Sequence, residues 1–309
     1  AEMQRFILLR FGQAILAFFA VSIIVFGLAR ISGDPLDTLL SFEAGADPEQ
    51  RAKIAAYWGL DKSLPEQYVT FIWNASHLNF GNSFKYRLEA ADLIKDRAPN
   101  TFMLAGLAIV VATLIALPIG VLSAVKKDSP LDYFGKILAL FGQSAPPFWL
   151  GLLLMWIFAV KLGLVQTSGK GGFTSIILPA VALGLFWVAA LMRLVRSAML
   201  DVLDSEYVKL ARIKGLAEWK VIWKHVFRNA AIAPLTFFGL ILGNLLLGSV
   251  SIETVFQWPG LGYLAFEAVF ARDFPVVQGV VLVFSAIFIL VNFIVDILYA
   301  YLDPRIRYQ

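Results

Sequence analysis

The sequence predicts an all-α integral membrane protein with six transmembrane helices. Its hydrophobic share is 59% and its mean hydropathy is +0.76, which exceeds the apolar character of ordinary soluble domains. Each predicted span has close to, or more than, the roughly 20 residues that a helix needs to cross a bilayer core. The windows are uniformly apolar rather than alternating, so helices and not barrel strands are expected. Six windows contain no charged residue: 11–29, 101–125, 137–160, 176–192, 229–252 and 274–295.

Proline positions suggest where the spans are irregular. Pro146 and Pro147 lie near the start of the third window, while Pro118 and Pro179 lie in the second and fourth. Proline removes a backbone donor and disturbs a helix, so we expect interruptions at these points. A kink that serves helix packing is favoured over a gate. The first window reads as a span rather than a signal peptide, because no A-x-A-like cleavage site follows it.

The chain divides into three parts on these grounds. Residues 1–30 form a first transmembrane helix, residues 31–98 an outer segment of about 70 residues, and residues 99–309 a core with the remaining five spans. The outer segment has too little apolar surface for a core of its own. Its predicted helices follow from capping and proline rules. They run from Asp47-Pro48 to near Trp58, from Pro65 to near Asn74, and from Ala90 to Ala98, where Pro99 is expected to end the helix.

Charge predicts that both termini are cytoplasmic. Fifteen Lys and Arg residues fall on the side of the termini and eleven on the other. Eight of those eleven lie in 30–97, a long segment that also holds ten acidic residues and to which the positive-inside rule applies weakly. The net charge of +4 is therefore mainly a signal of topology, and no nucleic-acid partner is expected.

Candidates for chemistry are few. The chain has no Cys, which excludes disulfides and thiolate metal sites, and its two histidines, His77 and His225, lack any partner spacing for a metal. We therefore expect no catalytic residue, no metal ligand and no cofactor in this chain. Asn292 and Asp296 lie one turn apart in or just beyond the sixth window, where packing or an ion pair with Arg305 is favoured over substrate contact.

A charged island at 198–229 interrupts the apolar runs. Its helical spacing from Leu200 to Lys214 predicts one helix, and Gly215 follows where a left-handed residue commonly ends a helix. The run from Trp219 to Phe227 predicts an amphipathic helix suited to the membrane interface. Two interpretations of this helical hairpin remain open from its physics. It is either a solvated positive-inside loop or a docking element for a cytoplasmic partner.

Several short motifs, among them Glu206-Tyr207-Val208, Ala211 to Leu216 and Glu253 to Gly262, stand out along the chain. In order and spacing they resemble membrane permease subunits of bacterial ABC importers, in the branch for dipeptides, oligopeptides and nickel. One departure is that the Glu-Ala-Ala of the generic importer loop is replaced by Lys209-Leu210-Ala211. The motifs that carry the resemblance are spread along the chain. They are Gly33-Asp34-Pro35, Gly59-Leu60-Asp61, Pro99-Asn100-Thr101, Pro146 to Gly151, Glu206-Tyr207-Val208, Ala211 to Leu216, His225 to Ala230, Glu253 to Gly262, Arg272 to Pro275 and Asp303-Pro304-Arg305.

The resemblance implies the type I ABC importer transmembrane fold and a role in ATP-driven import across the bacterial inner membrane. It implies two ATP-binding cassette subunits that hold ATP and Mg, a second and similar but different permease, and an extracytoplasmic solute-binding protein. Residues 201–214 would be the coupling helix. No substrate-binding residue is identified. The residues expected to couple to the ATPase are Asp204, Glu206, Tyr207, Ala211, Arg212, Lys214, Gly215 and Leu216.

Peptide is the favoured substrate class within this branch. Nickel chelates, glutathione, opines and oligosaccharides are the alternatives, because the separate binding protein largely makes the selection. Two other classes of function compete with a transporter. An integral membrane enzyme would need clustered acids, histidines or a nucleophile-base pair, none of which is recognisable in the sequence, and a passive channel would conduct without nucleotide.

Overall fold

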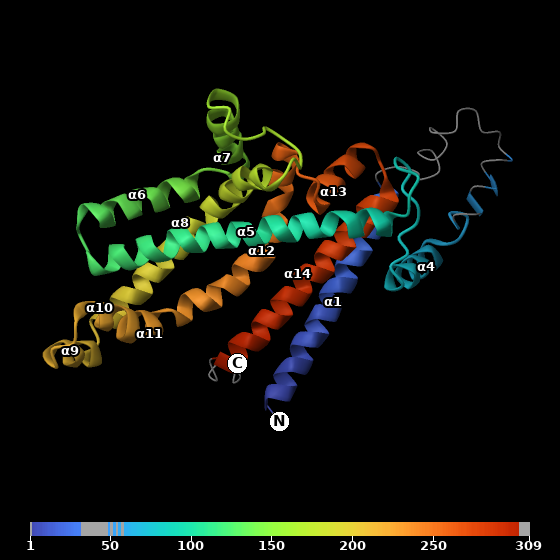
Figure 1. Ribbon diagram of the computed structural model, residues 1–309. Coiled ribbons are helices and arrows are strands. Elements are labelled where there is room, and N and C mark those ends of the chain that lie inside the picture. Colours follow the sequence, from blue (N-terminus) through green and yellow to red (C-terminus); the bar gives the residue numbers. More distant parts are fainter. Residues whose placement is uncertain (1, 32–48, 50–51, 54, 57–58, 303–309) are drawn as a thin grey trace. The chain divides into compact units, whose positions relative to one another are not determined.

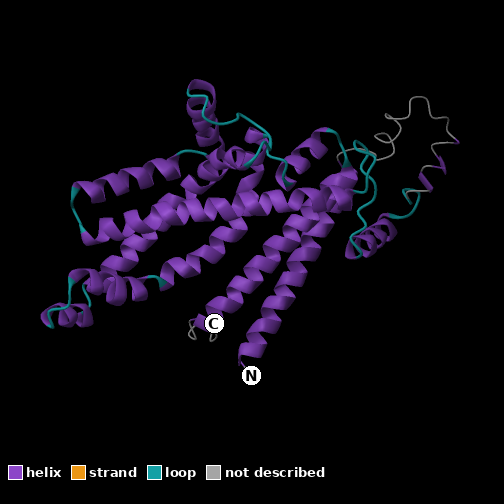
Figure 2. Cartoon of the chain, viewed as in Figure 1, coloured by secondary structure: helices purple, strands orange, loops and turns teal. Residues whose placement is uncertain are grey.

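The computed structural model describes residues 2–31, 49, 52–53, 55–56 and 59–302. Regular structure in these residues is helical, apart from one antiparallel bridge between Asn82 and Glu89 (Figures 1 and 2). The chain forms two compact units, one of residues 1–100 and 259–309 and one of residues 101–258. Much of the helix predicted to begin at Asp47-Pro48 lies outside the described residues.

The first unit is built around two long antiparallel helices. Its helices are α1 (Glu2–Ile31), α4 (Leu64–Ser76), the first turns of α5 (Ala90–Val125), α13 (Leu261–Phe270) and α14 (Phe274–Leu302). Helix α1 packs along α14, where Arg10 Nη1 lies 3.2 Å from Asp296 Oδ2. The ion pair predicted for Asp296 is therefore made with α1, and Arg305 lies outside the described residues.

Helix α4 confirms the helix predicted from Pro65. It lies against α1, where Tyr68 and Ser22 hydroxyls are 2.8 Å apart and Arg30 Nε donates to Gln67 Oε1 at 3.0 Å. Glu66 in its first turn accepts from the Ser63 backbone N–H at 3.1 Å and from the Ser63 hydroxyl at 2.8 Å. These bonds lower the pKa of Glu66, since they favour the charged carboxylate.

A buried carboxylate fixes the turn that precedes α5. Asp273 is fully buried and accepts from Ser83 Oγ at 2.5 Å and from the backbone N–H groups of Phe84 and Lys85 at 3.1 and 3.3 Å. Tyr86 donates to Glu267 Oε2 at 2.9 Å. The pKa of Tyr86 is raised because burial and this hydrogen bond favour its neutral form.

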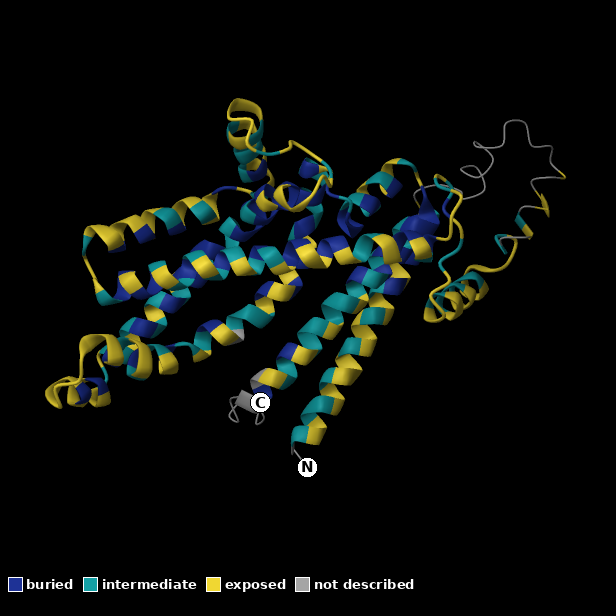
Figure 3. Ribbon diagram, in the orientation of Figure 1, coloured by how far each residue is buried: buried dark blue, intermediate teal, exposed yellow. Residues whose placement is uncertain are grey.

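The second unit holds the remaining helices. Besides the rest of α5 they are α6 (Pro130–Ser144), α7 (Pro147–Leu154), the π-helix η1 (Met155–Lys161), the 3₁₀-helix η2 (Phe173–Ile176), α8 (Ile177–Leu203), α9 (Glu206–Ile213), α10 (Glu218–Lys220), the π-helix η3 (Val221–Phe227), α11 (Arg228–Ala230) and α12 (Ile232–Phe256). Figure 3 shows that buried residues follow α8, the central helix of this unit.

Five helices among the described residues are long and apolar enough to span a membrane, and the number is six if one bent pair of helices counts as a span. The predicted third span is that pair, α6 with α7 and η1, which meet at 106°. The cause is local. Ala145 and Pro146 have extended backbones with ψ of 124° and 140°, as expected for residues that precede proline. The interruption predicted at Pro146-Pro147 is confirmed, and it is sharper than a kink.

The helix end predicted at Pro99 was wrong, and the kinks expected at Pro118 and Pro179 stay predictions. Helix α5 runs unbroken through Pro99 and Pro118, so it does not end at Ala98. Packing outweighs the local preference at Pro99, because buried Thr101 donates to Glu253 at 2.7 Å within the second unit. Pro179 lies in the first turn of α8, where a backbone N–H would have no acceptor within the helix, so proline is tolerated there.

Glycines bring α5, α6 and α8 into close contact. A Cβ added at Gly184 of α8 would lie 2.7 Å from the Ala108 carbonyl oxygen of α5, and one at Gly120 would lie 2.9 Å from the Met192 carbonyl oxygen. Gly142 of α6 is similarly close to the Leu185 carbonyl oxygen, at 3.2 Å. These three helices therefore form a tight bundle whose α8 leads directly into the charged island.

Candidate functional site

The charged island forms a helical hairpin, residues 198–229, at the end of α8 (Figure 1). Helix α8 ends at Leu203 with Asp204 as its cap, and Ser205, with an extended ψ of 147°, begins α9. The prediction of one helix from Leu200 to Lys214 was wrong. The break lies at Ser205, which has an extended backbone and whose hydroxyl donates to the Val202 carbonyl at 2.6 Å.

Gly215 makes the turn between the two arms of the hairpin. Its φ of +72° lies in the left-handed region, which glycine adopts without a Cβ penalty. Its N–H donates to the Arg212 carbonyl at 2.9 Å, and the Leu216 N–H donates to the Ala211 carbonyl at 3.3 Å. The glycine predicted to end the first helix of the hairpin is confirmed in that position.

The second arm differs from the predicted amphipathic α-helix. It is α10, η3 and α11 in succession, and its centre is a π-helix. Because π-helical bonds join residues five apart, Val221 and Val226 share the buried face. Trp219 and Trp223, predicted on the apolar face, are 64% and 51% exposed.

The inner face of α9 packs against the second arm, and the second arm packs on α8. Val208 and Ala211 are buried and belong to one apolar core with Met199 of α8 and with Val221 and Val226 of the second arm. The second arm therefore links α9 to α8. A hairpin held in this way can move with α8 as a rigid body, which a flexible loop could not.

The outer face of α9 carries an exposed apolar stripe: Tyr207, Leu210, Ile213 and Leu216 are 44%, 53%, 82% and 39% exposed. They recur every third residue, one position before the buried Val208 and Ala211. Leu210 was not among the predicted coupling residues, and Ile213 was missed as well. The position of Ile213 between Arg212 and Lys214 could have predicted its exposure, because an isoleucine among charged residues on an exposed helix has no apolar core to pack into.

Ion pairs stiffen the hairpin. Arg212 Nη2 lies 2.7 Å from Glu218 Oε1 and so ties α9 to the second arm, while Lys209 Nζ lies 2.8 Å from Glu206 Oε1. The hydrogen bond to Glu218 raises the pKa of Arg212, and the one to Glu206 raises the pKa of Lys209. Each carboxylate favours the charged form of its partner.

The predicted coupling residues thus share one hairpin but not one face. Ala211 faces the core, and Gly215 shapes the turn. The Tyr207 hydroxyl accepts from Asn229 Nδ2 of the second arm at 3.1 Å. The exposed members of the set are Asp204, Glu206, Tyr207, Arg212, Lys214, Gly215 and Leu216.

Neither histidine is placed for metal binding. His77 Nδ1 lies 2.8 Å from the Trp73 carbonyl oxygen within an exposed turn. In the part of the chain that the structure describes, no three His, Cys, Asp or Glu side chains are grouped to hold a metal ion. The hairpin offers a surface for contact instead of a centre for chemistry.

Comparison with known proteins decides the family. Residues 116–308 match the family described as binding-protein-dependent transport system inner membrane component, and residues 3–105 match its N-terminal membrane component. The chain belongs to this permease family. The resemblance stated from the sequence motifs is therefore confirmed, and the chain is a transport subunit rather than an enzyme.

Two relatives match over nearly the whole chain. The dipeptide transport system permease protein DppB of Escherichia coli (strain K12) is 37% identical, with 99% of this chain and 100% of the relative covered. The di/tripeptide transport system permease protein DppB of Pseudomonas aeruginosa (strain UCBPP-PA14) is 39% identical with the same coverage.

Solved structures support the fold. A subunit of the MetNI methionine ABC transporter has a TM-score of 0.55 at 19% identity and covers 68% of this chain and 96% of its own. An amino acid ABC transporter chain has a TM-score of 0.54 at 15% identity, covering 67% of this chain and 92% of its own. The type I importer fold expected from the sequence is confirmed.

Proposed function

We propose that this permease carries peptides across a bacterial inner membrane as one of two permease subunits of an ATP-driven importer. Support for peptide as the substrate class comes from the relatives named for dipeptide and di/tripeptide transport, each at least 37% identical over the full chain. The second permease is a different but similar chain, and an extracytoplasmic solute-binding protein delivers the peptide.

The hairpin is the proposed dock for an ATP-binding cassette subunit. The observation that carries this role is the exposed apolar stripe of α9, whose residues lie one position before the buried Val208 and Ala211. Exposed apolar patches on an otherwise charged element are typical of interaction surfaces. ATP and Mg are bound by the two cassette subunits, and this chain holds no cofactor.

The stripe gives a direct test. Ile213→Asp places a carboxylate at its most exposed member, so the cassette subunits should no longer copurify with the permease. Ala217→Asp is the matched control, because it adds the same charge to the hairpin at the first residue before α10, where aspartate is favoured. Equal recovery of the cassette subunits with both variants would refute the dock.

Substrate class is tested in liposomes that contain the complete importer and its cognate binding protein. Labelled dipeptide should accumulate only with ATP, and an excess of unlabelled di- or tripeptide should compete. Uptake displaced instead by a nickel chelate, glutathione, an opine or an oligosaccharide would assign that class in place of peptide. Flux without nucleotide would indicate a channel, and ATP hydrolysis by this chain alone would contradict the division of labour.

A further inference from the structure

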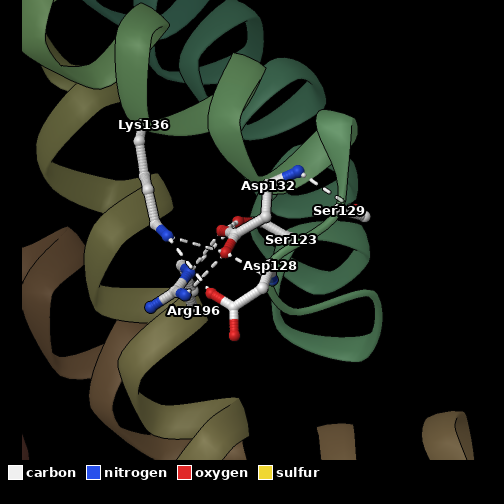
Figure 4. A network of polar contacts seen from close by, with 6 residues as sticks. All are labelled: Ser123, Asp128, Ser129, Asp132, Lys136 and Arg196. Carbon is white, nitrogen blue, oxygen red and sulfur yellow. Dashed lines mark hydrogen bonds and ion pairs between the residues drawn. The ribbon is translucent and has the colours of Figure 1, made fainter.

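One carboxylate is buried among cations where α6 begins. Asp132, in the first turn of α6, has a side chain with no exposed surface. Arg196 of α8 donates to it through two nitrogens, Nε to Oδ1 at 2.8 Å and Nη2 to Oδ2 at 2.9 Å (Figure 4). Lys136, one turn along α6, approaches Oδ2 to 2.9 Å. A bidentate bond of this kind fixes both distance and direction.

The same carboxylate also binds the end of α5 and the turn that follows it. Ser123 of α5 donates its hydroxyl to Oδ1, and the backbone N–H of Asp128 donates to Oδ2 at 3.1 Å. Arg196 Nε is also 3.1 Å from Ser123 Oγ. One buried group therefore joins α5, α6 and α8, and Figure 4 shows their side chains converging on it.

This cluster lies close to the hairpin along α8. Arg196 precedes the end of α8 by seven residues, a rise of about 10 Å. Between them Met199 is fully buried in the core that also contains Val208 of α9. Packed apolar side chains connect the polar cluster to the proposed dock without a break.

Apolar packing and a polar cluster constrain helices differently. Apolar contact is non-directional, so it opposes separation of α8 from α6 more than it opposes sliding. A slide that parts Arg196 from Asp132 would leave charged groups without their buried partners, which is strongly unfavourable.

We propose that the Asp132–Arg196 pair makes α5, α6 and α8 move as one body with the hairpin during the transport cycle. Both are positioning residues, which act through the helices and not on the substrate. The inference rests on the proposed function, because it requires that force enters through α9. The inference adds that this force reaches the bent α6–α7 pair through the Asp132–Arg196 ion pair.

The test compares Arg196→Met with Arg193→Met in the complete importer. Arg193 lies one turn earlier on α8, is exposed, and makes none of the bonds of the cluster. Arg196→Met should lower the peptide taken up per ATP hydrolysed by about tenfold while cassette subunits still copurify. Arg193→Met should match the unmodified importer.

Spin labels supply a readout that a purely structural role would not change. The chain has no native cysteine, so Phe134→Cys on α6 and Lys220→Cys on α10 can be labelled in one chain. Their separation should be the same in nucleotide-free and ATP-trapped importer. With Arg196→Met it should differ between the two states.

The outcomes separate the two proposals. In one outcome, Arg196→Met and Arg193→Met give the same peptide uptake per ATP and the same spin-label separations in both nucleotide states. That result would overturn the proposed role of the Asp132–Arg196 pair and leave the proposed docking site unaffected. Failure of cassette subunits to copurify with the unmodified chain would overturn the dock itself. If the importer does not assemble with Arg196→Met, the double variant Asp132→Asn with Arg196→Gln removes both charges together. A spin-label separation that is the same in both nucleotide states of this double variant would also refute the inference.

Discussion

At the scale of single residues, Gly215 gives the hairpin its turn. A Cβ at this position would meet nothing within 4 Å, but φ is +72°, so the cost of Gly215→Ala is conformational, about 1–2 kcal/mol. We expect a lower melting temperature for the solubilised permease and weaker recovery of cassette subunits. Gly215→Asn should lose less, because asparagine tolerates the left-handed region. Equal melting temperatures for Ala and Gly would contradict this account.

Asp273 is the residue whose loss should destabilise the first unit most directly. Asp273→Ala leaves Ser83 and two backbone N–H groups without their acceptor, at a cost of at least about 2 kcal/mol. The unfolding transition of the detergent-solubilised chain should shift to lower temperature. Asp273→Asn keeps one acceptor oxygen, so its unfolding temperature should lie between those of the unmodified chain and Asp273→Ala. An unshifted transition for Asp273→Ala would refute the stabilising role of the Asp273 carboxylate.

The sequence could predict the role of a residue where neighbouring residues in the chain determine that role. Gly215 follows a charged helix and was found from that pattern alone. Arg196 lies 64 positions from its partner Asp132, and Ser83 lies 190 positions from Asp273, and no periodicity connects such pairs. The predicted coupling set omitted Leu210 and Ile213, because the sequence pattern did not distinguish the buried apolar stripe of α9 from the exposed one.

At the scale of helices, small residues set how closely α5 and α8 approach. Gly120→Ala should cost about 1–3 kcal/mol, since its Cβ would lie 2.9 Å from both the Met192 carbonyl and Val195. Gly106→Ala is the matched control on the same helix, where a Cβ meets nothing within 4 Å. It should be neutral or stabilising. Comparison of the two melting temperatures checks the prediction, and equal shifts would contradict it.

Helix existence was easier to predict than helix ends. The six uncharged windows of the sequence indicated the long apolar helices of the described residues, because a helix needs about 20 apolar residues to cross a bilayer core. Local proline rules gave the correct break at Pro146-Pro147 and a false end at Pro99. The difference lies in packing: the residues after Pro99 are held by buried hydrogen bonds, whereas two consecutive prolines remove two donors at once.

At the scale of the whole molecule, sequence composition points to topology more strongly than to substrate. Charge asymmetry between loops predicts which side of the membrane each segment occupies. Substrate class has no comparable signal, because no metal-binding group among the described residues marks a binding pocket. That part of the proposal depends on relatives and on transport measurements.

The predicted sidedness can be measured on the intact protein. With no native cysteine, Lys214→Cys in the hairpin and Ser76→Cys at the end of α4 each provide one exposed thiol. If the termini and the hairpin are cytoplasmic, an impermeant maleimide should label Ser76→Cys in right-side-out vesicles and Lys214→Cys only in inside-out vesicles. The reverse pattern would place the exposed stripe of α9 on the side without ATP and exclude its role as a dock, whatever the fold.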